Sequence, residues 1–205
     1  MKRYAFALPL FFWASSALAD PVQAVDDAAR NLFTGMPDVQ MVSEMSRHCG
    51  ARPPANQSIV YCTRVNTIFV REGYRAEATA PFAFAHMFGR AAQVQHGVAD
   101  FAFNQIQRRP DEELVLRSMV IRQTECLAGV FYARAGLPKT RLTELYTSEP
   151  FTEPHWGRGP IASGPSVSIG FGARDEWFLK GQSSGDPLEC SVEEITSSMF
   201  QRGLR

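Results

Sequence analysis

The sequence has no excess of either charge. Its 205 residues include 21 Lys and Arg against 21 Asp and Glu, which gives a formal net charge of zero at pH 7. A nucleic-acid-binding domain carries clustered basic charge that meets the phosphate backbone, so we expect no nucleic acid among the partners. Beyond the first twenty residues, no apolar run approaches the roughly 20 residues that a transmembrane helix requires. We therefore expect no membrane span.

The N-terminus has the layout of a secretory signal peptide. Lys2 and Arg3 precede an apolar stretch over residues 4–13, and Ala17-Leu18-Ala19 stands directly before Asp20. A basic start, an apolar centre and small residues at the end are typical of a cleaved export signal. We expect residues 1–19 to be removed and the protein to be periplasmic or secreted.

The mature segment, residues 20–205, has 186 residues (205 − 19), which is enough for a single domain with its own hydrophobic core. Cysteine is scarce, with four residues in the whole chain. An even number of cysteines in an exported protein suggests two disulfide bonds, because the compartment is oxidising. Four cysteines allow three pairings, and their spacing alone leaves all three open.

Apolar periodicity and turn residues predict a mixed α and β chain. The segment between residues 149 and 172 is rich in Pro, Gly and Ser, and we expect a loop there. The tail over residues 201–205 has nothing obvious to pack against, and we expect it to fray. The predicted elements are helices over residues 21–33, 81–94, 110–136, 141–147 and 173–180 and strands over residues 58–61 and 67–70.

Four blocks of the sequence carry motifs of a known family. Residues 85–93, Ala-His-Met-Phe-Gly-Arg-Ala-Ala-Gln, fit the frame A-H-E-x-G-H-H-V-Q, which contains the zincin signature H-E-x-x-H. Residues 122–131 are similar to E-L-Q-A-D-C-F-A-G-V-W. Cys49-Gly50, followed by Tyr61-Cys62 and a strand, resembles a C-G, Y-C and strand block. Residues 174–190 resemble the C-terminal pattern R-x-x-W-F-x-x-G-x-x-S-G-D-x-x-x-C. The four blocks, in the same order, resemble the neutral zinc metallopeptidases of bacteria.

The resemblance implies a zincin-like α+β fold. Two long central helices would pack on a small β-sheet, and a disulfide bond would hold an irregular C-terminal part against this core. The cysteines fall at family positions, which implies that Cys49 pairs with Cys62 and Cys126 pairs with Cys190. The second bond would fasten the C-terminal block to the second long helix.

The residues that would bind zinc in such a family are missing. In an H-E-x-x-H helix two histidines one turn apart hold the metal, and the glutamate deprotonates its bound water. Here His86 is followed by Met87, which accepts no proton, and by Arg90, which does not deprotonate and so cannot be a ligand. The third ligand would fall at Ile121, and a further family histidine falls at Ser168.

Glu125 falls where the family has an aspartate that supports a zinc histidine from outside the metal shell. We therefore expect His86 and Glu125 to face each other across the two long helices and to form a hydrogen bond. We also expect Arg90 to join them and to place its positive charge at the former zinc position.

The resemblance therefore predicts an exported, non-catalytic relative of the metallopeptidases that acts as a binding or regulatory protein. We expect no cofactor, and the partner could be a protein or a peptide that the sequence does not identify. The alternative is an active metal-dependent hydrolase with an unusual zinc site. That site would draw on His86, His96, Glu125 or a nearby carboxylate such as Asp100.

Overall fold

The structure is a computed structural model that describes residues 20–45, 57–152 and 165–205. The expected signal peptide over residues 1–19 and the expected partner of Cys62, Cys49, lie outside the described residues. Within the described ranges, none of the helices is both long enough and apolar enough to cross a bilayer.

The chain has a mixed α+β architecture in which helices dominate. The helices are α1 (Pro21–Leu32), α2 (Ala80–Gln95), α3 (Val98–Arg108), α4 (Glu113–Arg134), α5 (Leu142–Leu145) and α6 (Phe171–Ser184). The strands are β1 (Asp38–Val42), β2 (Ile59–Cys62) and β3 (Thr67–Arg71). Short 3-10 turns lie at Tyr74–Ala76, Pro110–Glu112, Pro187–Cys190 and Ser197–Phe200.

The three strands form one small sheet in the order β1-β3-β2. The pair predicted from the β-branched runs is present as the antiparallel β2 and β3, with Val60 opposite Phe69. β1 was not predicted, and it pairs with β3 in parallel. Ile68 of β3 points into the main core, whereas Val60 and Phe69 belong to a second, smaller apolar cluster. Both faces of the sheet are therefore used for packing.

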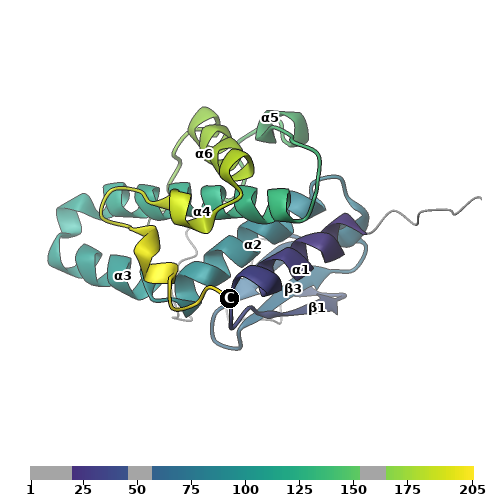
Figure 1. The fold of residues 1–205 in the computed structure, drawn as a ribbon, viewed down its shortest axis with the longest axis horizontal. Helices are drawn as coiled ribbons and strands as arrows, with labels where there is room; N and C mark the ends of the chain where they lie inside the picture. Colours follow the sequence, from purple (N-terminus) through teal and green to yellow (C-terminus); the bar gives the residue numbers. More distant parts are fainter. Residues whose placement is uncertain (1–19, 46–56, 153–164) are drawn as a thin grey trace, which may run out of the picture.

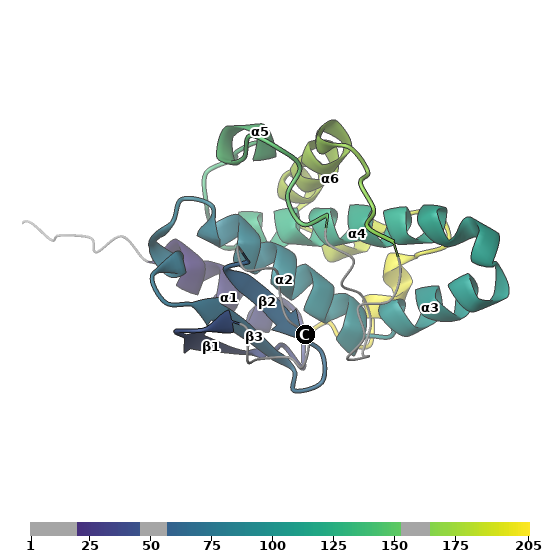
Figure 2. The same cartoon turned by 180° about the vertical axis from the view of Figure 1, so that it is seen from behind.

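Helix α2 is the centre of the molecule. Most of its side chains are buried, as expected of a helix that is apolar on every side. It contacts α1 and β2 as well as α4. The two opposite views show α2 lying between α4 and the layer formed by α1 and the sheet (Figures 1 and 2). The two long helices expected from the sequence are therefore present, but only α2 lies directly against the sheet in these views.

Helices α4 and α6 approach each other closely because both carry glycine where they cross. A Cβ atom built on Gly129 would lie 2.1 Å from the carbonyl oxygen of Phe178. A Cβ atom built on Gly181 would lie 1.9 Å from the carbonyl oxygen of Cys126. The predicted disulfide between Cys126 and Cys190, with a Cα–Cα distance of 5.5 Å, joins α4 to the turn that follows α6.

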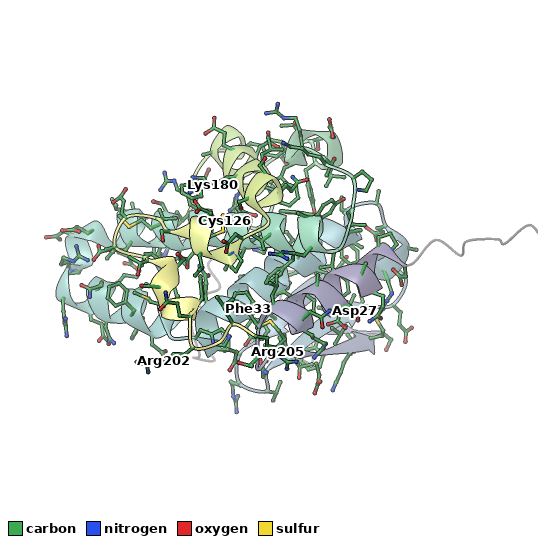
Figure 3. The ribbon with its side chains drawn as sticks, viewed as in Figure 1. Asp27, Phe33, Cys126, Lys180, Arg202 and Arg205 are labelled. Carbon is green, nitrogen blue, oxygen red and sulfur yellow. A yellow bond between two sulfur atoms is a disulfide. The ribbon has the colours of Figure 1, made fainter. Side chains whose placement is uncertain are left out.

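The C-terminal part is more regular than expected. The predicted helix over residues 173–180 extends from Phe171 to Ser184, so it begins inside the segment that was expected to be loop. The expectation of a frayed tail is wrong. The Thr34 N–H donates to the carbonyl of Gly203, the Arg205 N–H donates to the carbonyl of Leu32, and the chain end meets α1 near Phe33 (Figure 3). This backbone pairing holds the tail in place.

Candidate functional site

The site begins at the crossing of α2 and α4. Gly89 makes the crossing tight, because a Cβ atom there would lie 2.9 Å from the carbonyl oxygen of Thr124. His86, one turn before Gly89, and Glu125, next to Thr124, are consequently brought together. The structure shows the pair that the sequence predicts: Nδ1 of His86 lies 3.3 Å from each carboxylate oxygen of Glu125. Both side chains are almost completely buried.

A third buried side chain, Arg174 of α6, completes the arrangement. Its guanidinium Nη1 donates to Glu125, and its Nε donates to Oε1 of Glu149 at 2.7 Å. Its Nη2 donates to the carbonyl oxygen of Phe151 at 3.1 Å. Arg174 has no exposed surface. One cation therefore donates to two carboxylates from separate parts of the chain, and such charge-assisted hydrogen bonds are about twice as strong as neutral ones.

Glu149 is held by further donors from the segment before α6. The hydroxyl of Ser168 and the backbone N–H of Ile169, the latter at 3.1 Å, both donate to its carboxylate. By the resemblance, Ser168 occupies a position at which the family has a histidine. In this chain the Ser168 hydroxyl donates a hydrogen bond to Glu149. The carboxylate of Glu149 thus receives three donors and is only 12% exposed.

The aromatic ring of Phe151 covers the imidazole of His86. The two rings stack with their centroids 4.3 Å apart and an angle of 14° between their planes. Phe151 has a φ of 53°, a left-handed conformation that is uncommon for a residue other than glycine. The ring and the strained backbone together close this side of the buried cluster.

A pocket of about 360 Å³ lies beside this cover. Its wall includes Phe151 and Pro150 together with Tyr74, Thr79 and Tyr146. The Tyr146 hydroxyl is buried and makes no hydrogen bond among the residues that the structure describes. Because Phe151 lines the pocket and also stacks on His86, one aromatic ring separates the pocket from the charged cluster.

The electrostatics follow from burial and from the paired charges. Burial lowers the pKa of His86, and the nearby Glu125 carboxylate offsets this only in part. Burial works to raise the pKa of Glu125, but the attraction of His86 and Arg174 outweighs it and holds that pKa below its ordinary value. For Glu149, burial is likewise outweighed by the hydrogen bonds from Ser168 and Arg174, so its pKa is lowered. Both carboxylates are therefore ionised at neutral pH.

The other positions named from the resemblance differ in their surroundings. Met87 is fully buried in the main apolar core, and Ile121 is half-buried on α4. Burial lowers the pKa of Arg90 to about 10, so Arg90 remains a cation at neutral pH and lowers the pKa of nearby His86. The cation bonded to Glu125 is Arg174 rather than the expected Arg90. A buried arginine from α6 reaches Glu125 because α6 crosses directly over α4.

The described residues around His86 do not offer a set of zinc ligands. A zinc site in a protein needs at least three His, Cys, Asp or Glu side chains in one place, and no such group exists in the described part of the chain. Both carboxylates of the cluster are already bonded to Arg174. Of the alternative ligands, His96 stacks on Phe33 at the far end of α2, and Asp100 is exposed on α3.

Two contributors to this cluster were not identified from the sequence. Arg174 was noted only as the first residue of the C-terminal block, and Glu149 only as the beginning of a loop. A loop has no periodicity that would show which of its charges turns inward. The available signal was a charged residue, Arg174, in the predicted helix whose other buried residues are Asp175, Phe178 and Gly181.

Comparisons with models of known protein families, with curated proteins and with solved structures find no match. The resemblance to the metallopeptidases therefore rests on the sequence blocks alone.

Proposed function

We propose that this chain is an exported, non-catalytic member of the neutral zinc metallopeptidase family that acts as a binding or regulatory protein. The observation that supports this most directly is the position of Arg174. Its guanidinium donates a hydrogen bond to the carboxylate of Glu125. The same carboxylate lies beside His86, the one remaining histidine of the zincin frame. A fixed organic cation there balances the buried negative charge that a metal ion would otherwise balance.

The chemistry of the neighbouring positions agrees with this proposal. A peptidase of the zincin type needs a general base within reach of a metal-bound water. Met87 has no basic group, Ile121 has no donor atom, and Arg90 stays protonated at neutral pH. Within α2, all of which the structure describes, no carboxylate replaces the missing glutamate. What remains is a folded scaffold with a buried ion cluster next to an open pocket.

The first test is metal analysis of the purified mature protein after dialysis. The proposal expects less than about one tenth of an equivalent of zinc per chain and no peptidase activity. Zinc at one equivalent, together with peptide hydrolysis, would instead support an active hydrolase with an unusual site that uses His86 and Glu125.

The second test restores the missing groups together. The triple variant Met87→Glu, Arg90→His and Ile121→Glu recreates the family's ligands and general base, and it is expected to bind one zinc ion per chain. The matched control, Met87→Glu, Arg90→Gln and Ile121→Glu, has the same charge but lacks the second imidazole, and it should bind zinc at least tenfold more weakly. A triple variant that melts cooperatively yet takes up no zinc would mean that the family alignment is wrong.

A further inference from the structure

The segment Glu149-Pro150-Phe151 lies in the site in the manner of a bound peptide. It has neither helix nor strand structure of its own. Nε of Arg174 donates a hydrogen bond to the carboxylate of Glu149, and Nη2 of Arg174 donates one to the carbonyl oxygen of Phe151. The ring of Phe151 stacks on His86. These contacts come from two helices, with Arg174 on α6 and His86 on α2. The scaffold is thus complementary to a carboxylate and an aromatic ring two residues apart.

The donors that hold Glu149 are arranged as a carboxylate-binding site. A guanidinium, a hydroxyl from Ser168 and a backbone N–H from Ile169 all converge on it. Such a combination of a planar cation and neutral donors recognises a carboxylate by geometry as well as by charge. Any carboxylate that reached this position would find the same three donors.

The segment also has room to leave. Pro150 and Phe151 form part of the wall of the pocket of about 360 Å³, so open space lies directly beside them. Phe151 has a left-handed backbone that a side chain of this size disfavours. The strain weakens the segment's hold relative to an unstrained peptide that makes the same contacts.

We propose that Glu149-Pro150-Phe151 is an intramolecular ligand that occupies a peptide-binding site, and that the external ligand is a peptide carrying an acidic residue two positions before an aromatic residue. The incoming carboxylate would bind Arg174, Ser168 and Ile169, and the incoming ring would stack on His86. This inference rests on the proposed binding function and names the chemistry of its ligand. It adds a regulatory feature, because the protein's own segment must leave before the ligand binds.

The test uses the peptide acetyl-Glu-Pro-Phe-amide as the probe and isothermal titration as the measurement. The double variant Glu149→Ala and Phe151→Ala removes the competing carboxylate and ring, and it should bind the probe at least tenfold more tightly than the wild-type protein does. The control peptide acetyl-Gln-Pro-Ala-amide should bind neither protein. The control variant Glu189→Ala and Phe103→Ala, which removes an exposed carboxylate and an exposed ring elsewhere, should behave as the wild type.

A second readout places the binding at His86. Modification of that imidazole by diethyl pyrocarbonate should be at least fivefold faster in the double variant than in the wild-type protein, and the probe should slow it again. Equal affinities of a cooperatively melting double variant and the wild-type protein would overturn the proposal. Should the double variant fail to fold, Phe151→Ala alone decides: tighter probe binding supports the proposal, and unchanged binding refutes it.

The two proposals fail separately. If neither protein bound the probe, the result of the metal analysis would be unaffected. The proposal of a non-catalytic relative of the metallopeptidases would then stand without this ligand. Stoichiometric zinc in the wild-type protein would overturn the proposed function, and the titrations with the probe would still report whether segment 149–151 competes for Arg174.

Discussion

Arg174 and Glu125 form an ion pair in which neither side chain has any exposed surface. They come from α6 and α4, the two helices that cross closely at Gly181 and Gly129, and the Cys126–Cys190 disulfide joins α4 to the turn that follows α6. Removing two charges from water costs several kcal/mol per ion, and this cost is recovered only where each remaining donor and acceptor is satisfied. Here Arg174 meets that condition through Glu149 and the carbonyl of Phe151.

Breaking this pair from one side should be strongly destabilising. Arg174→Met leaves Glu125 as a buried charge with only His86 beside it, and we expect a loss of about 3–5 kcal/mol in the free energy of unfolding. Urea unfolding followed by circular dichroism measures this loss. Arg71→Met breaks an exposed pair with Glu77, in which both side chains are 48% accessible, and should cost no more than about 1 kcal/mol.

A double-mutant cycle separates the pair from its surroundings. Arg174→Met combined with Glu125→Gln removes both charges, so its cost should be smaller than the sum of the two single costs by about 1–3 kcal/mol. Additive costs would mean that the two side chains do not interact in solution.

The glycine crossing of α4 and α6 should tolerate no side chain. Gly129→Ala and Gly181→Ala place a methyl group within about 2 Å of backbone atoms that cannot move aside, and each should cost about 2 kcal/mol or more. Gly172, in the same helix as Gly181, has no atom within 4 Å of the position that a Cβ would take. Gly172→Ala should therefore be neutral or stabilise by up to about 1 kcal/mol. Thermal melting compares the three variants, and equal melting temperatures would show that the two helices do not cross at these glycines.

The helices α2 and α4 and the pairing of His86 with Glu125 could be predicted from the sequence because they depend on residues within helices. Apolar residues at helical spacing locate α2 and α4, and the resemblance places His86 and Glu125 on their facing sides. The pairing of Cys126 with Cys190 follows from the same blocks. The two helices are set by short-range periodicity, which is visible in a single chain, whereas the facing pair and the disulfide pairing were expected from the family resemblance.

Other features depend on tertiary contacts that no local pattern reveals. β1 alternates poorly, since Asp38-Val39-Gln40-Met41-Val42 has no fully buried position, and its strand form requires pairing with β3. The order of residues 203–205 comes from backbone hydrogen bonds to the end of α1. The role of Arg174 depends on how α6 crosses α4, which is a property of the folded chain.

The disulfide should supply a large share of the stability. The two cysteines are 64 residues apart, and closing a loop of that length contributes about 4 kcal/mol in the chain-entropy model. The double variant Cys126→Ala and Cys190→Ala should lose about this amount in urea unfolding. The 190–200 segment should stay docked in the native state, because Nε2 of Gln123 also donates to the carbonyls of Cys190 and Ile195. Hydrogen exchange of residues 192–200 that becomes as fast as in a free peptide would contradict this second expectation.

Acidification should destabilise the protein in two stages. Burial lowers the pKa of His86 and of His96 below the ordinary value of 6.5. As the pH falls through 6.5, the unfolded chain therefore binds protons that the folded chain does not, and stability is lost at up to about 1.4 kcal/mol per pH unit for each histidine. The pKa values of Glu125 and Glu149 are lowered from 4.5, so their contribution is present above pH 4.5 and is lost below it.

Two variants assign the two stages, with unfolding free energies measured by urea titration at each pH. His96→Phe keeps a ring against Phe33 but removes one titrating group, so it should reduce the slope between pH 6.5 and 5 by about half if His86 and His96 dominate it. Glu149→Gln should leave that slope unchanged and should reduce the further loss below pH 4.5, because one of the two carboxylates that must be protonated there is gone. A slope between pH 6.5 and 5 that is the same in wild type and His96→Phe would show that His96 titrates normally in the folded protein.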